Sequence, residues 1–174
     1  RPERGKILIH GKSCGKCRGY GVALILENPV KSMLFEELSC ADNLCLTLDR
    51  KVKGIWRSHR KKQGIVRELL GKIDGTKRGR NMSVKEKYEI IYTRVLYESP
   101  EIVFCFYPYR NIDIELREHI EVLMKRFLEA GIAVVIVSVN LRDAIPLVDR
   151  AVLVNHGINR ATIERDEFEK MIIE

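Results

Sequence analysis

Apolar residues are grouped along this chain in two patterns: short unbroken runs, and longer stretches where they return every three or four positions. The runs at 102–107 and 132–139 contain almost no polar residue, which is typical of strands that are buried on both faces of a sheet. The stretches at 83–98 and 113–130 have helical spacing. Strand and helix therefore alternate after residue 82, and this alternation predicts an α/β layer with parallel strands.

The ends of the two predicted helices carry capping residues. Ser83 precedes the first helix and Glu86 stands three positions later, which is the pattern of a capping box, while Pro100 excludes continuation. Asp113 precedes the second helix, and Gly131 follows its apolar face. The pattern also predicts strands at 6–10, 22–26 and 151–154, and helices from Ser39, at 57–70, at 141–147 and at 166–173.

The net charge of +7 is concentrated in one segment. Between positions 50 and 62 there are seven basic residues and no acid: Arg50, Lys51, Lys53, Arg57, Arg60, Lys61 and Lys62. Lys72, Lys77, Arg78 and Arg80 extend this basic segment. Such a cluster can bind nucleic acid or an anionic membrane surface. The alternative is a solvated helix face, because no aromatic platform accompanies the charge.

Five cysteines in a chain that does not open with an export signal indicate reduced thiols in the cytoplasm. Cys14 and Cys17 have the spacing of half a zinc site, which Cys40 and Cys45 could complete, or of a redox pair. The simpler interpretation of Cys45 and Cys105 is that they lie in the core. The longest apolar runs are far too short to cross a bilayer.

The stretch from Gly5 to Ser13 has the outline of a phosphate loop but does not satisfy its requirements. Five residues separate Gly5 and Gly11, where the phosphate loop has four. Lys12-Ser13 runs into further glycine instead of a helix whose N-terminus could face phosphates. The sequence between the glycines is that of a strand, and we exclude a phosphate loop here.

Spaced residues after position 82 nevertheless resemble a known family. Met82-Ser83, Arg94, Pro100, Pro108, Arg110 and Asp113 resemble the ATP-binding cassette (ABC) subunits of bacterial transporters. They are most similar to the second cassette of the double-cassette ATPases for ribose and galactose uptake. Further segments resemble the same family at 5–12, 21–29 (its Q-loop region), 38–44, 135–140 (its switch-histidine strand) and 148–154.

The resemblance implies a fold and a domain organisation. The expected fold is α/β, a P-loop NTPase (ABC ATPase)-like parallel sheet with a small antiparallel β part and a helical subdomain. It implies one degenerate nucleotide-binding domain over residues 1–174, truncated at its N-terminus, with the helical subdomain at about residues 38–98.

Several positions depart from the family's catalytic pattern. Phe106 and Tyr107 occupy the positions of the Walker B Asp and Glu, which would hold Mg²⁺ and orient the attacking water. Val84 replaces a signature glycine that lets backbone amides approach a phosphate. Val139 replaces the switch histidine, and Glu27 replaces the Q-loop glutamine. The resemblance therefore implies a scaffold that does not hydrolyse ATP.

The remaining expectations concern vestigial sites and partners. Ser83 and Glu27 are vestigial nucleotide contacts, although the simpler explanation of Ser83 is that it caps the helix. Arg110 and Asp113 match the D-loop, where two cassettes touch, although Asp113 is also explained as a cap. The resemblance implies no cofactor for these residues themselves, and ATP with Mg²⁺ only in a full-length protein that supplies a phosphate loop.

The implied partners are a second ABC cassette, as a homo- or heterodimer, and a transmembrane permease subunit. The implied location is cytoplasmic, peripheral on the inner face of the membrane. Two other hypotheses remain: a regulatory module that binds a partner or nucleic acid through the basic segment, and an active ATPase with a phosphate loop upstream. Phe106 and Tyr107 argue against the second of these.

Overall fold

The computed structural model describes residues 8–9, 11–13, 21–48, 52–54, 58–71, 73–140 and 144–168. The strands are β1 (Leu8–Ile9), β2 (Lys12–Ser13), β3 (Val22–Ile25), β4 (Ile102–Phe106), β5 (Ala133–Val137), β6 (Arg150–Asn155) and β7 (Ile158–Glu164). The α-helices are α1 (Pro29–Met33), α2 (Cys40–Cys45), α3 (His59–Leu70), α4 (Val84–Glu98) and α5 (Ile114–Glu129), and short 3-10 helices span Gly79–Asn81, Ile145–Leu147 and Arg165–Glu167.

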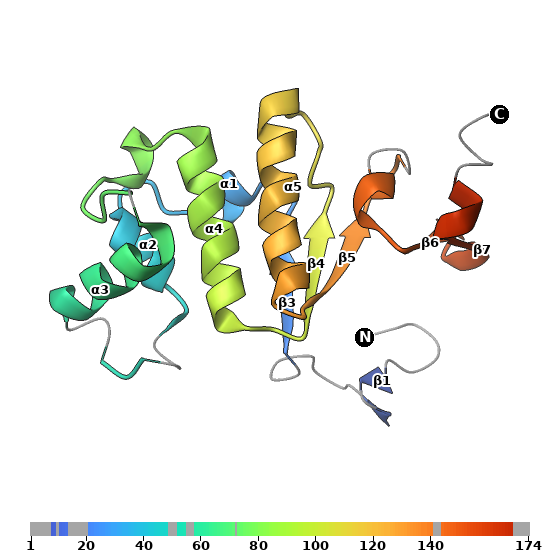
Figure 1. The fold of residues 1–174 in the computed structure, drawn as a ribbon, viewed down its shortest axis with the longest axis horizontal. Coiled ribbons are helices and arrows are strands. Elements are labelled where there is room, and N and C mark those ends of the chain that lie inside the picture. Colours follow the sequence, from blue (N-terminus) through green and yellow to red (C-terminus); the bar gives the residue numbers. More distant parts are fainter. Residues whose placement is uncertain are drawn as a thin grey trace.

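A parallel sheet of three strands in the order β3-β4-β5 is the centre of the described fold. The helices α4 and α5 pack side by side over one face of this sheet (Figure 1). The β6–β7 and β1–β2 pairs are antiparallel and form separate two-stranded sheets. The predicted α/β architecture, with parallel strands and a small antiparallel part, is therefore confirmed.

Two clusters of buried apolar side chains stabilise the described residues. The larger cluster lies between the sheet and the helices α4 and α5, where the Tyr92 and Phe127 rings stack with centroids 5.7 Å apart. Such a ring pair contributes roughly 0.5–1.5 kcal/mol beyond the burial of its area. The second cluster joins α2 and α3 to the outer side of α4 through Leu44, Ile65 and Ile90. The limits of a helical subdomain at about 38–98 stay a prediction.

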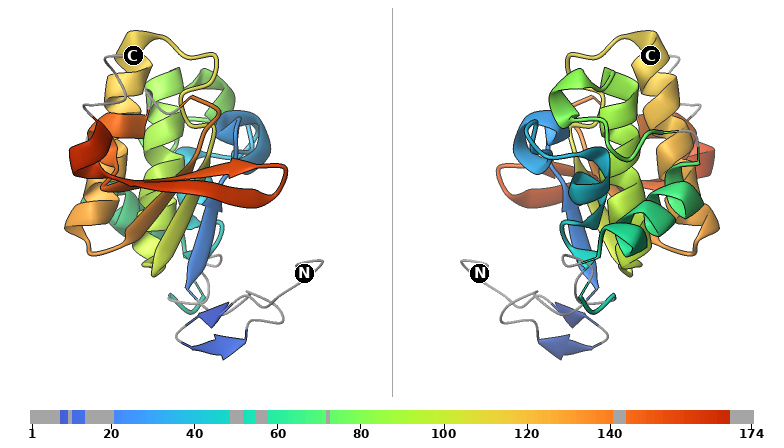
Figure 2. Two further views of the ribbon diagram at one scale, coloured as in Figure 1. Left: turned by 90° about the vertical axis from the view of Figure 1, so that its right-hand side faces the viewer. Right: turned by 90° about the vertical axis from the view of Figure 1, so that its left-hand side faces the viewer.

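The strands β4 and β5 are not buried on both faces, and this prediction was wrong. In β4, Val103 and Cys105 are fully buried under the helices, whereas Phe104 on the opposite face is partly exposed. Val135 of β5 is 38% exposed, and Leu24 of β3, on the other side of Phe104 in the same cross-strand row, is 50% exposed. Among the described residues the helices cover one face only, as the two side views show (Figure 2). The apolar runs therefore reflect a sheet with an uncovered apolar face.

This uncovered sheet face is formed by alternate residues of the three strands. In the observed register they make cross-strand rows: Val22–Ile102–Ala133, Leu24–Phe104–Val135 and Phe106–Val137, with Leu26 beyond the end of β3. All nine are apolar. Parallel strands with such apolar sequences are normally covered by helices on both faces of the sheet.

The C-terminal part differs from the prediction in two elements. A 3-10 turn at Ile145–Leu147 replaces the predicted helix at 141–147, whose first three residues lie outside the described part. Residues 169–173 of the predicted terminal helix also lie outside it. The strand β7 was not predicted. It is joined to β6 by the two-residue turn His156-Gly157, where both residues have positive φ, at 50° and 73°. A two-residue turn with this backbone matches the twist of a hairpin, so the Gly after an apolar run was the missed signal.

Candidate functional site

Ser83 lies at the N-terminus of α4, where the predicted capping box is present. Its hydroxyl accepts a hydrogen bond from the Glu86 backbone N–H at 3.2 Å, and its own N–H donates to the Glu86 carboxylate at 2.6 Å. The Lys77 ammonium pairs with the same carboxylate at 2.7 Å. The hydrogen bond from Lys77 is the largest cause that lowers the pKa of Glu86. An ionised side chain of the protein thus already occupies the positive end of this helix.

The position where the family has its Walker B carboxylates is aromatic and apolar. Phe106 ends β4 on the uncovered face, and its ring lies 6.5 Å from that of Phe104. Tyr107 follows with a positive φ of 48°, and its N–H donates to the carbonyl of Val137 at 2.8 Å. Within the described ranges, no group of three or more His, Cys, Asp or Glu side chains could hold a metal ion. Neither aromatic side chain can coordinate Mg²⁺.

Glu27 and Arg110, which the sequence assigned to different roles, contact each other. The Arg110 guanidinium donates to a Glu27 carboxylate oxygen at 2.8 Å, across 83 positions of sequence. Both follow strands of the parallel sheet, at the carboxyl edge where such sheets bind ligands. Both side chains are about half exposed, so the pair contributes at most about 1 kcal/mol. Each is therefore held by the other at the carboxyl edge of the sheet.

Asp113 and Val139 complete the set of residues named from the resemblance. One Asp113 carboxylate oxygen accepts a hydrogen bond from the Leu116 backbone N–H at 2.7 Å, so Asp113 is the N-cap of α5. Val139 lies beyond β5 and is 90% exposed. It has no atom that can accept or donate a proton.

A buried polar junction was not given a role from the sequence. Arg94 in α4 is 4% exposed, and its guanidinium donates to the carbonyls of Asn43 at 2.9 Å and Met33 at 2.7 Å. The Asn43 side chain in turn bonds both the N–H and the carbonyl of Phe35. Burial lowers the pKa of Arg94. These bonds fix the segment that runs from α1 to α2, immediately after Glu27.

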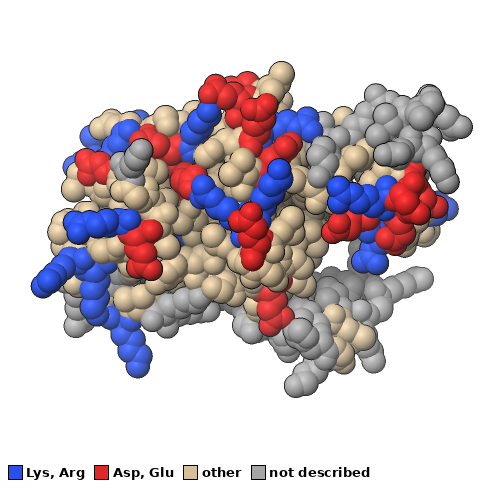
Figure 3. All heavy atoms as spheres, in the orientation of Figure 1, with Lys and Arg blue, Asp and Glu red and all other residues tan. Residues whose placement is uncertain are grey.

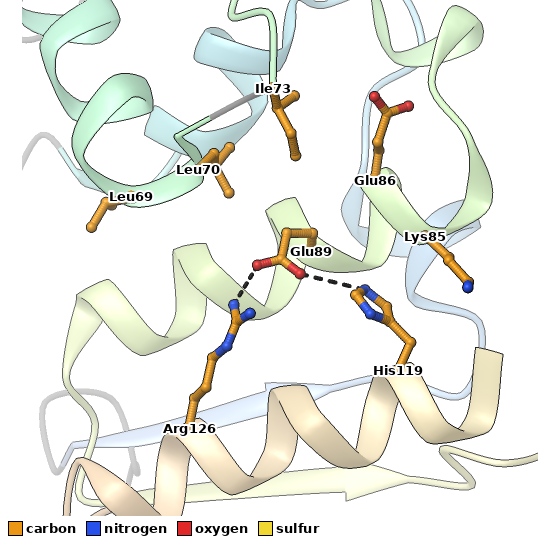
Figure 4. A pocket seen from close by; sticks show the side chains of 8 residues that line it. All are labelled: Leu69, Leu70, Ile73, Lys85, Glu86, Glu89, His119 and Arg126. Atoms are coloured by element: carbon orange, nitrogen blue, oxygen red, sulfur yellow. Dashed lines mark hydrogen bonds and ion pairs between the residues drawn. The ribbon is translucent and has the colours of Figure 1, made fainter. Parts of the chain in front are cut away.

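A cleft of about 440 Å³ lies over α4, between the C-terminal end of α3 on one side and α5 on the other (Figure 4). Its apolar wall is Leu69, Leu70 and Ile73, and its charged side chains come from α4 and α5. Glu89 lies at its centre and pairs with Arg126 and with His119. The other charges of the lining, Lys85 and Glu86, pair with Glu115 and Lys77. Every charged side chain of the described lining is thus paired with an opposite charge.

The basic segment is smaller in the structure than in the sequence. Arg50, Lys51 and Arg57 lie outside the described residues, whereas Lys53, Arg60 and Lys61 are exposed. Lys62 is different: its side chain is only 12% exposed and pairs with Asp42 of α2. In the proposed extension, Lys77 pairs with Glu86, and Arg78 and Arg80 share one carboxylate partner, Glu37. Lys72 lies outside the described residues.

The described cysteines are core residues. Cys40, Cys45 and Cys105 are all fully buried. Burial is the largest cause that raises their thiol pKa values, to about 12, about 11 and about 12. This confirms the prediction for Cys45 and Cys105 as apolar core residues. Cys14 and Cys17 lie outside the described residues, so the pairing proposed for a zinc site remains a prediction.

The fold is that of an ATP-binding cassette ATPase. A solved structure of the ATP-binding cassette MJ0796, a dimer in a post-hydrolysis state with ADP and Pi, superposes on 95% of this chain and 75% of that chain. The TM-score is 0.70 at 18% identity. No family model matches the sequence.

The curated proteins that match this chain include ATP-binding proteins named for sugar import. The chain is 24% identical, over 99% of its length, to the ribose import ATP-binding protein RbsA of Halalkalibacterium halodurans. It is 25% identical over 96% to a putative ribose/galactose/methyl galactoside import ATP-binding protein of Geobacillus kaustophilus, and 23% over 98% to the xylose import protein XylG of Pectobacterium atrosepticum. The predicted resemblance to sugar-import cassettes is confirmed. The chain spans about a third of these relatives, 37%, 35% and 36% of their lengths. None of the described helices has the length and apolar character needed to cross a membrane.

Proposed function

We propose that this chain is a degenerate cassette of a sugar-type ABC transport system, which pairs with another cassette and does not itself hydrolyse ATP. The observation that carries the proposal is the end of β4, where Phe106 packs beside Phe104 and Tyr107 follows. Phosphoryl transfer to water needs a metal ligand and a group that orients the water at this position. Two aromatic side chains supply neither.

Two further contacts support a cassette without turnover. At the N-terminus of α4, Glu86 takes the place of an anionic ligand, so a phosphate would have to displace a carboxylate that Lys77 also holds. At the carboxyl edge of the sheet, Glu27 and Arg110 neutralise each other. Both sites are thus occupied by the protein's own charges.

The partners that fit this function are a second cassette and a membrane permease, at the inner face of the membrane. The matched relatives are named as import ATP-binding proteins, and the solved cassette is a dimer. We place the cassette contact at Arg110 and Asp113, which lie at the carboxyl edge of the sheet and are exposed. A competent partner would then supply the catalytic carboxylates.

The first experiment measures ATP and ADP binding by isothermal titration, with and without Mg²⁺, together with phosphate release. We expect phosphate release at the background rate for the unmodified chain. We expect the same for Phe106→Asp combined with Tyr107→Glu, because the capped α4 and Val139 are unchanged. Mg²⁺-dependent turnover by the unmodified chain would refute the proposal.

The pairing is tested by titrating the chain with a competent sugar-import cassette in analytical ultracentrifugation. Arg110→Glu should weaken the heterodimer at least tenfold, since it places like charges together at Glu27. The matched control is Arg165→Glu, because Arg165 is a similarly exposed arginine in a surface ion pair with Asp149. Equal affinity of the two variants for the partner cassette would show that Arg110 does not lie in the interface.

A further inference from the structure

Ion pairs are unevenly distributed over the described surface. Most described cations near α4, α5 and the connecting loops have a carboxylate partner: Lys62–Asp42, Lys77–Glu86, Arg78 and Arg80 with Glu37, Lys85–Glu115, Lys87–Glu36, Arg110–Glu27, Arg117–Glu121, Arg126–Glu89 and Arg165–Asp149. The exposed side of α3 departs from this pattern. Lys53 precedes the helix, Arg60 and Lys61 lie in its first turn and Arg67 lies in its last turn; these four exposed side chains, which we call the α3 basic cluster, have no ion-pair partner among the residues that the structure describes.

Two cations of the α3 basic cluster lie at a position that is unfavourable for the helix itself. The first turn of α3 contains no acid, so Arg60 and Lys61 lie at the positive end of the helix macrodipole. A cation at this end costs about 0.3–1 kcal/mol. The only acid in the helix, Glu68, lies in its last turn. The isolated chain therefore carries a local excess of positive potential that an anionic partner would relieve.

Packing holds the α3 basic cluster in one orientation. The opposite face of α3 is fixed in the core by Ile65, Val66 and Leu70. The Lys61 ammonium donates to the backbone carbonyl of Lys53 at 3.1 Å, which keeps the 52–54 loop against the first turn. Figure 3 shows basic side chains projecting from the α3 end of the molecule, beyond the mixed charges of the remaining surface.

We propose that the α3 basic cluster binds the phosphate headgroups of an anionic phospholipid surface. Clusters of four to eight Lys and Arg on an amphipathic helix have this affinity, at roughly 1 kcal/mol for each cation near the surface. Here α3 contributes three cations and the loop before it contributes Lys53. The helix and the 52–54 loop contain no Phe, Tyr or Trp, and the sequence between them contains one, Trp56. A single aromatic ring does not provide the successive stacking platforms that a nucleic acid needs, which favours lipid. The apolar side chains of α3 are committed to the core, so the contact is adsorption without insertion.

This lipid contact goes beyond the proposed cassette function, since it requires neither nucleotide nor permease. In the sequence, Arg50, Lys51 and Arg57 precede the same helix, although they lie outside the described residues. The lipid contact would hold the helical part of the molecule against the membrane even before a permease is bound.

The test is co-sedimentation of the 174-residue chain with phosphatidylcholine vesicles that contain about 30% phosphatidylglycerol, compared with vesicles of phosphatidylcholine alone. We expect binding to the anionic vesicles only, which weakens as salt shortens the Debye length. Arg60→Glu, Lys61→Glu and Arg67→Glu together should reduce the partition coefficient by about 100-fold. The matched control reverses three exposed cations elsewhere, Lys125, Arg150 and Arg160, and should retain most of the binding.

Thermal unfolding of both triple variants checks that each is folded, and a neutral triple variant with Gln at positions 60, 61 and 67 should lose an intermediate amount. Equal binding by the two charge-reversal variants would overturn the proposal. So would binding to single-stranded oligonucleotides, at the same salt, that is tighter than binding to the vesicles. That result would identify the cluster as a nucleic-acid contact.

Discussion

At the scale of single residues, Arg94 is the side chain whose environment is most unusual. It is a guanidinium with 4% exposure whose described hydrogen bonds go to main-chain carbonyls of Asn43 and Met33. The helical spacing of α4 gave no sign of this, because an arginine between apolar residues is equally compatible with a solvated helix face. Its burial depends on α1 and α2, whose residues Met33 and Asn43 lie 61 and 51 positions away in sequence.

Replacing Arg94 with Met should reduce the free energy of unfolding by roughly 2–5 kcal/mol. Met keeps most of the side-chain volume, so the loss arises chiefly from two buried carbonyls without a donor. Urea denaturation followed by circular dichroism measures the change. Arg150→Met, at an exposed position of β6, is the control and should change stability by less than about 0.5 kcal/mol. Equal losses at the two positions would contradict the role of the junction.

At the scale of elements, α4 and α5 were predicted closely, and the strands less well. Ser83 with Glu86 and Asp113 with Gly131 identify both helices, because caps are local chemistry that the sequence shows directly. The burial of β4 and β5 was overestimated. An apolar run such as Ile102–Phe106 indicates that both faces of a strand avoid water, but not what covers the second face.

The capping box of α4 yields a test at this scale. Ser83→Ala should destabilise the chain by about 1 kcal/mol, because the Glu86 backbone N–H loses its acceptor. Thermal or urea unfolding measures the difference. Ser138→Ala, at an exposed serine beyond β5, should have a smaller effect.

The pH dependence of Glu86 follows from the same contacts. Its pKa is lowered in the folded protein, first by the hydrogen bond from Lys77, so its contribution is complete above the ordinary value of 4.5 and is lost as pH falls through the folded pKa. Glu86→Gln should therefore be less stable than the unmodified chain at pH 7, and the difference should shrink below about pH 4. A constant difference over this range would show that ionisation of Glu86 does not stabilise the fold.

At the scale of the whole molecule, the uncovered sheet face is the largest departure from the usual α/β arrangement. Leu24, Phe104 and Val135 form its central row, in contact with solvent among the described residues. The candidate site, too, could be predicted only in part from the sequence. The sequence located Glu27, Arg110, Phe106 and Tyr107 on family grounds, but the Glu27–Arg110 pair joins distant segments, and only the tertiary fold brings them together.

The uncovered face predicts dye binding. Leu24→Ser should reduce the fluorescence of bound anilinonaphthalene sulfonate, because it breaks the central apolar row. Val122→Ser on α5 is the matched control, since both side chains are 50% exposed in the structure. An equal decrease for the two variants would show that the dye does not bind this face.

The junction around Arg94 also has a mechanical consequence. Glu27 directly precedes Asn28, the N-cap of α1, and the last residue of α1, Met33, is bonded to Arg94 in α4. Asn43 ties α2 to the same guanidinium. We therefore expect that a displacement at the carboxyl edge of the sheet, such as one produced by a partner that separates Glu27 from Arg110, moves α1 and, through these hydrogen bonds, α4 and α2 as well.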